Sequence, residues 1–166
     1  MRKQLSEEKY SFIHQKDKDF IIAFDEAMLK SSYESGGTID NGFCWGRYMI
    51  IYSKAGVKSK KVAARIYIRD NEIVLRLFMN EIDKHRGYIE NAPEFIRLPF
   101  TGAHGSCNHC KNDHEGICKF RKTYILENHM IEKCNGVTFE FYKPDLNKLP
   151  EYIALFREFY PIKKGR

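Results

Sequence analysis

The chain has 166 residues, is 43% hydrophobic and 14% aromatic, and carries a formal net charge of +6 at pH 7. This supply of apolar side chains is enough for a packed core and excludes a chain that is disordered throughout. The longest dense apolar run, residues 20–24, is far shorter than the ~20 residues of a membrane-spanning helix, so we expect no membrane partner.

The first predicted element is helical, beginning near residue 6. Apolar and small residues recur at helical spacing over residues 20–31, and three glycines within residues 34–42 end the pattern. Alternating apolar residues then predict strands over residues 47–53, 62–69 and 72–79.

A short helix is predicted over residues 81–91, because Asn80 can cap its start and Pro93 stops it. A polar, glycine-punctuated loop follows it over residues 99–120. Three further strands are predicted beyond this loop, with Asn-Gly at 135–136 as a hairpin signal before the last. These strands cover residues 122–127, 129–134 and 137–143. An amphipathic helix over 149–160 closes the chain.

This order of elements predicts the α+β class. We expect a single domain over residues 1–166, with a mainly antiparallel sheet built from two three-stranded runs. N-terminal, middle and C-terminal helices pack on part of that sheet. A loop over 104–118, completed by the hairpin over 122–134, is expected to be a metal-binding insertion.

Four of the five cysteines suggest a metal site. Their spacing is Cys107-x2-Cys110-x7-Cys118-x15-Cys134. A C-x2-C pair gives a tetrahedral metal two ligands from one turn, and a hairpin turning near Asn128 would bring Cys134 back opposite about Thr123. The start of the chain has no apolar stretch, so we expect a cytoplasmic location, where thiols stay reduced and bind metals.

Zinc in a closed, structural site is the favoured interpretation, since four thiolates fill a tetrahedral shell. One of three histidines in the same loop could replace a cysteine: His104, His109 or His114. An iron–sulfur cluster is an alternative, which the hydrophilic surroundings disfavour. A catalytic zinc is a further alternative, yet the sequence has neither an H-E-x-x-H helix nor the H-x-E of zinc deaminases. Clustered free thiols are the interpretation without a metal.

The middle strands suggest a ligand-binding face. Period-two alternation places Arg65, Tyr67 and Arg69 on one side of the second strand, and Arg76 and Phe78 on the same side of the third. Arginine can bind a phosphate or carboxylate through two parallel hydrogen bonds, and aromatic rings can stack on a flat ligand. Three lysines between the first two strands are expected at the rim of this face: Lys58, Lys60 and Lys61. A solvated face without a ligand is the alternative.

The sequence therefore predicts a small cytosolic zinc-binding protein that is a non-catalytic binding or regulatory module for an anionic ligand or nucleic acid. Residues 46–92 support an anionic partner, because they carry ten Lys/Arg against five Asp/Glu. The competing class is an enzyme, either an open-site zinc hydrolase or an iron–sulfur redox protein. Cys44, beside the only tryptophan, is expected to be buried packing.

Overall fold

The computed structural model of the protein describes residues 1–58, 61–102, 121–134 and 137–162. The chain divides into two compact units, Met1–Phe78 with Glu140–Arg166 and Met79–Phe139. Each unit is described by itself below, and the single folding domain expected over 1–166 stays a prediction. Among the described helices, none combines the length and hydropathy of a membrane span.

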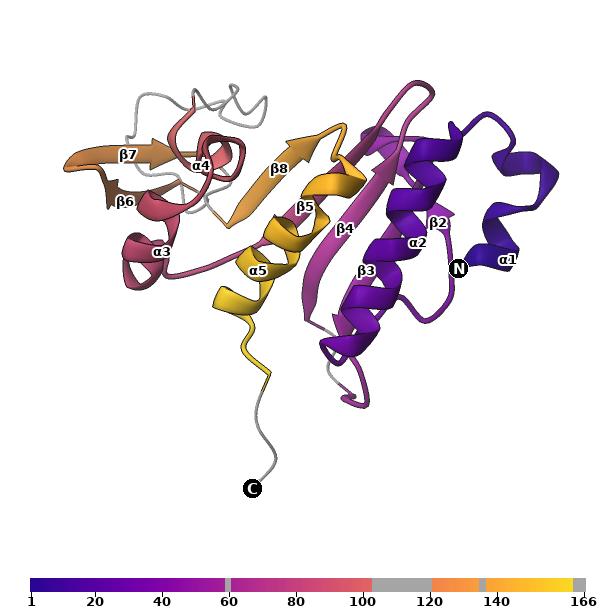
Figure 1. The fold of residues 1–166 in the computed structure, drawn as a ribbon, viewed down its shortest axis with the longest axis horizontal. Helices are drawn as coiled ribbons and strands as arrows, with labels where there is room; N and C mark the ends of the chain where they lie inside the picture. The colour runs from indigo at the N-terminus through magenta and orange to yellow at the C-terminus, as the bar shows by residue number, and fades with distance from the viewer. Residues whose placement is uncertain (59–60, 103–120, 135–136, 163–166) are drawn as a thin grey trace. The chain divides into compact units, whose positions relative to one another are not determined.

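The first unit is built on a six-stranded sheet (Figure 1). In its central strands the side chains alternate between the two faces of the sheet, as the sequence predicts. Strand β3 pairs antiparallel with β4, and β4 pairs antiparallel with β5. The strand order is β1-β3-β4-β5-β8, and β2 also pairs with β3. The strands are β1 (Tyr33–Glu34), β2 (Asp40–Asn41), β3 (Tyr48–Lys54), β4 (Val62–Ile68), β5 (Ile73–Phe78) and β8 (Thr138–Tyr142). The boundary between the units falls within β8, whose first two residues belong to the second unit.

Helices α2 (Gln15–Lys30) and α5 (Leu149–Phe159) lie side by side and cover one face of this sheet (Figure 1). The Phe24 ring of α2 packs edge-on against Tyr52 of β3, with ring centroids 5.2 Å apart. The Tyr152 ring of α5 packs against Phe141 of β8 at 5.2 Å. Burial of these rings stabilises the packing of both helices on the sheet. The shorter helices of this unit are α1 (Arg2–Leu5), η1 (Glu8–Tyr10), η2 (Phe43–Trp45) and η5 (Leu146–Lys148).

The second unit combines short helices with a two-stranded sheet of β6 (Lys122–Leu126) and β7 (His129–Lys133). Its helices are η3 (Ile82–His85), α3 (Arg86–Asn91) and α4 (Glu94–Thr101). The ring of Phe100 stacks on Phe139 at 4.2 Å, and the Tyr124 hydroxyl donates to the Phe100 carbonyl at 2.6 Å. The hairpin turns at Glu127 and Asn128, which both adopt positive φ, as a two-residue type I′ turn requires.

The structure confirms the α+β class and the antiparallel sheet, with the main strands within two residues of their predicted bounds. The two three-stranded runs are wrong, because β8 joins the larger sheet beside β5 and leaves β6 and β7 as a pair. The N-terminal helix is also interrupted, since α2 begins only at Gln15. Helix α4 was not predicted, because Pro99 within it argues against a helix although Ile96 and Phe100 are buried at helical spacing.

Candidate functional site

The candidate ligand face is the side of the first unit's sheet opposite α2 and α5. Pairing of Arg65 with Arg76 and of Tyr67 with Val74 places these residues together, as the alternation predicts. The helix-covered side takes the alternate residues, such as Ile66, which pairs with Leu75. The two sides therefore differ in chemistry, one apolar and one mixing arginine with aromatic rings.

The centre of the candidate face is a buried polar network. Arg76 is only 5% exposed and donates to the Glu140 carboxylate through Nε at 2.7 Å and also through its Nη2. Its Nη1 donates to the Tyr67 hydroxyl at 3.1 Å, and Arg65 donates to that same oxygen at 3.3 Å. Arg76 and Tyr67 are thus part of the interior, because they are almost completely buried and their polar groups have hydrogen-bond partners.

The ring of Trp45 closes this network from outside. It stacks on Tyr67, with centroids 5.8 Å apart and planes 24° from parallel. The guanidinium carbon of Arg76 lies 4.1 Å from the centroid of the Trp45 ring, within the range of a cation–π contact. Since both partners come from the sheet, the opposite face of the Trp45 ring is the one that meets solvent, and Trp45 keeps 39% of its surface exposed.

Glu140 is the internal counter-ion of the face. Burial by itself would raise the pKa of this carboxyl group, but hydrogen bonds from Tyr142 and Arg76, with the charges of Arg76 and Arg69, lower the pKa below its ordinary value. The Tyr142 hydroxyl donates to the Glu140 carboxylate at 2.7 Å. Glu140 is therefore an anion at neutral pH that orients an arginine and a tyrosine together.

Arg69 links the Trp45 turn to the end of β8. Its Nε donates to the Trp45 carbonyl at 3.0 Å, and its Nη1 donates to Glu72 at 3.0 Å. Its guanidinium carbon lies 5.7 Å from the ring centroid of Tyr142. One end of the sheet thus brings together Trp45, Arg69 and Tyr142, and we call these three residues, with the flanking Phe43 and Arg47, the aromatic-basic rim.

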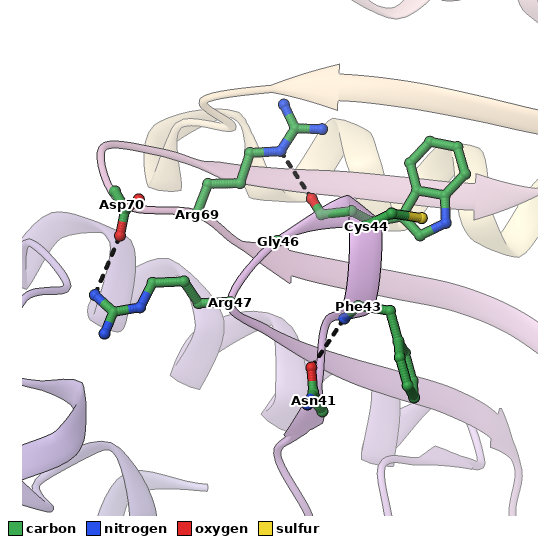
Figure 2. A pocket seen from close by; sticks show the side chains of 8 residues that line it. Asn41, Phe43, Cys44, Gly46, Arg47, Arg69 and Asp70 are labelled. Atoms are coloured by element: carbon green, nitrogen blue, oxygen red, sulfur yellow. Dashed lines mark hydrogen bonds and ion pairs between the residues drawn. The ribbon is translucent and has the colours of Figure 1, made fainter. Parts of the chain in front are cut away.

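An open pocket of about 590 Å³ lies in this part of the first unit, lined by the turn over residues 41–47 together with Arg69 and Asp70 (Figure 2). Figure 2 shows Arg69 and Arg47 on either side of Gly46, and Arg47 bonds to Asp70 at 3.1 Å. The charge of each arginine is therefore partly balanced, while the pocket remains accessible.

Two glycines and one strained residue shape the turn. A Cβ on Gly42 would lie 2.3 Å from the Gly46 carbonyl oxygen, and one on Gly46 would lie 2.8 Å from the Ile68 carbonyl oxygen. Phe43 adopts a φ of 52°, in the left-handed region that bulky residues avoid, and its side chain is 75% exposed. Backbone strain of this kind often accompanies binding sites.

The remaining residues of the predicted face lie further along the strands. The guanidinium carbon of Arg65 lies 5.3 Å from the ring centroid of Phe78, and the Arg65 Nε is buried with no hydrogen-bond partner among the described residues. Lys58 and Lys61 are exposed in the connection before β4, whereas Arg69 follows β4. Seven strand residues separate the two ends by about 20 Å, so these lysines are not beside the rim. Lys60 lies outside the described residues.

The predicted metal ligands fall mostly outside the described residues. These are Cys107, Cys110 and Cys118, with the possible substitutes His104, His109 and His114. Cys134 is described, is partly buried, and follows β7 directly. Pairing of Lys122 with Lys133 puts Cys134 beyond the last pair, so its expected position opposite Thr123 is wrong and it lies nearer in register to the end of the cysteine loop. Within the described residues, no three His, Cys, Asp or Glu side chains are grouped to hold a metal.

Several residues in or beside the rim are not among those that the sequence predicts for the ligand face. Cys44 was expected to be buried but is exposed, because the turn points Phe43 and Cys44 outward. Alternation in β8 could have placed Glu140 and Tyr142 on the side opposite the buried Phe139 and Phe141, although it does not show that they lie beside Arg76. The position of Trp45 over Tyr67 had no sequence signal, because it depends on how the turn folds back.

Comparison with known proteins gives no relative: the chain matches no protein-family model, no curated protein and no solved structure. Its function is therefore inferred from the geometry of the rim and from the chemistry of its side chains.

Proposed function

We propose that the protein is a non-catalytic cytosolic binding module that presents the aromatic-basic rim to an anionic ligand. The observation that carries this proposal is the ordered contact of Arg69 with both Trp45 and Tyr142 beside an open pocket. Arginine recognises phosphate and carboxylate groups through a rigid set of donors, and its neighbours here hold it in one orientation.

The rim suits binding better than catalysis. The titratable groups that line the adjoining pocket are Arg47, Arg69, Asp70 and the exposed thiol of Cys44, and each of the two arginines has a carboxylate partner. A nucleophilic thiol needs an adjacent base, and no histidine lines the pocket among the described residues. A ligand held by stacking and by charge therefore fits the site more closely than a substrate that is being transformed.

A structural zinc ion forms the second part of the proposal, with Cys107, Cys110, Cys118 and Cys134 as ligands. The hairpin register supports it, because Cys134 comes at the end of the strand ladder, where the chain enters from the cysteine loop. Elemental analysis of reduced protein, purified without a tag or chelator, should give about one zinc per chain. Absence of any metal would overturn this part, and iron with sulfide would favour the iron–sulfur alternative.

Binding is tested with two fluorescently labelled 12-residue oligomers, oligo(dT) and an abasic oligomer with the same phosphates. We expect at least one to bind with an affinity that falls as salt rises, because binding to phosphates releases counterions. Arg69→Gln should weaken binding and flatten the slope of log affinity against log salt by about 0.7 for each phosphate that the variant no longer neutralises. Glutamine keeps a donor for the Trp45 carbonyl, so the turn is retained.

Lys16→Ala on α2 is the matched control, since Lys16 is an exposed cation of the helical layer. Its binding should equal that of the unmodified protein. The proposal is overturned if neither oligomer binds, or if Arg69→Gln and Lys16→Ala behave alike.

A further inference from the structure

The exposed rings of the rim indicate which anionic ligand it takes. Phe43, Trp45 and Tyr142 are 75%, 39% and 56% exposed, and they come from two segments that are far apart in the sequence. Single apolar side chains on a surface are ordinary. Trp45 and Tyr142 differ from that case because Arg69 contacts both residues, through the backbone carbonyl of Trp45 and the ring of Tyr142.

Trp45 is a ring prepared for stacking. Its sheet-side face is held by Tyr67 and by the Arg76 guanidinium, which is itself oriented by Glu140. A ring that is already ordered loses little conformational entropy when a second ring stacks on its outer face.

The ring of Tyr142 is also ordered by its neighbours, through its hydroxyl group and through one face of the ring. Its hydroxyl donates to Glu140 at 2.7 Å, and the Arg69 guanidinium lies over its ring. The same carboxylate therefore orients Arg76 under Trp45 and the hydroxyl of Tyr142. Two ordered rings, with a guanidinium that contacts the ring of Tyr142 and the backbone carbonyl of Trp45, match a ligand that alternates flat rings with anionic groups.

We propose that this ligand is single-stranded nucleic acid, with unstacked bases on Trp45 and Tyr142 and a phosphate on Arg69; this rests on the proposed function. A duplex fits less well, because its base faces are stacked on one another and cannot reach the rings. The carboxylates of Asp70 and Glu72 offset part of the arginine charge, so recognition depends on the rings as well as on phosphate.

The test compares oligo(dT), the abasic oligomer and a duplex of equal length under one salt condition. Oligo(dT) should bind at least tenfold more tightly than either of the others. Its binding should also quench the fluorescence of Trp45, which is the only tryptophan in the sequence. Equal binding of oligo(dT) and the abasic oligomer would overturn the inference while leaving the proposed function intact. Tighter binding of the duplex would overturn it as well, whereas no binding at all is the failure of the proposed function.

Ring variants separate stacking from folding. Tyr142→Ala should lower oligo(dT) affinity about tenfold and leave abasic binding unchanged, and Tyr142→Phe, which keeps the ring, should restore most of the affinity. Trp45→Phe should likewise bind more tightly than Trp45→Ala. The control is Leu29→Ala, since Leu29 is an apolar residue of α2 that is 54% exposed. A decrease with Leu29→Ala equal to that with Tyr142→Ala would contradict the assignment.

Discussion

The two faces of the first unit's sheet are built by different means. The helix-covered face is apolar, and Ile50, Ile66 and Leu75 in its centre are completely buried. The opposite face is held by a polar network around Arg76, and its edge leaves Trp45 and Tyr142 in contact with solvent. Both faces contain buried residues, so burial alone does not tell them apart.

The difference lies in what each kind of interaction requires. Apolar packing involves no charged groups, so it depends little on pH, and it tolerates substitutions that conserve volume at small cost. The polar network works only if every member keeps its partner, because a buried charge without one is costly. Apolar packing on both faces of the sheet would be enough for a protein that needed only stability. The polar network instead orders Arg69 and the rings of Trp45 and Tyr142 at a surface that a ligand can reach.

The largest expected effect is on the helix-covered face. Leu75→Ala should lower the free energy of unfolding by about 3 kcal/mol, since it removes buried methyl groups and leaves a cavity. Urea denaturation at low and high salt would measure it, and the decrease should be the same at both. A decrease below ~1 kcal/mol would show that this face is not the packed one.

A somewhat smaller decrease is expected from the polar face. Arg76→Ala should cost about 2 kcal/mol, less than for a fully buried pair, because the Glu140 side chain keeps 24% exposure and can be partly solvated. Urea denaturation and Trp45 emission would report the lower stability and the release of the ring. Unchanged Trp45 emission would contradict the cation–π contact.

Acid should distinguish the two faces further. The pKa of Glu140 is lower in the folded protein than in the unfolded chain, so its ion pair contributes stability above the ordinary glutamate pKa. That contribution is lost as pH falls from about 4.5 through the lower folded value. Glu140→Gln should remove this part of the acid dependence, whereas Leu75→Ala should leave it in place. An identical pH profile for Glu140→Gln and the unmodified protein would refute the role of this carboxylate.

The smallest effect is expected at the exposed ion pair beside the pocket. The side chains of Arg47 and Asp70 are 51% and 71% exposed, so Asp70→Asn should change the free energy of unfolding by less than ~1 kcal/mol. Thermal denaturation would measure the change in stability. A decrease larger than ~1 kcal/mol would contradict the prediction and indicate that the pair belongs to the polar network around Arg76. Anion binding should increase slightly, because the variant removes the negative charge that pairs with Arg47 of the rim.

The alternation of apolar and polar residues predicts the central strands and the face of the sheet on which each of their side chains lies. Alternation alone assigned Arg65 and Arg76 to one face, and the pairing confirms it. The pattern could not show that β8 pairs beside β5, because strand pairing over a long separation is a tertiary property. Without that pairing, Glu140 could not be recognised as the partner of Arg76.

The ligand-accessible part of the face was harder to predict. The arginines and aromatics of β4 and β5 were expected to be exposed, yet Tyr67 and Arg76 are covered by Trp45. A turn that folds back depends on the close approach of Gly42 and Gly46, which spacing along the chain does not encode. The rim is consequently displaced toward one end of the predicted face.

The most direct test is an NMR titration of ¹⁵N-labelled protein with oligo(dT). We expect the largest amide shifts at Phe43 to Arg47, at Arg69 and at Tyr142, together with the Trp45 indole N–H. Amides of α2 and α5, on the covered side of the sheet, should stay in place. Shifts confined to those helices, or to residues outside the first unit, would contradict the assignment of the rim as the binding site.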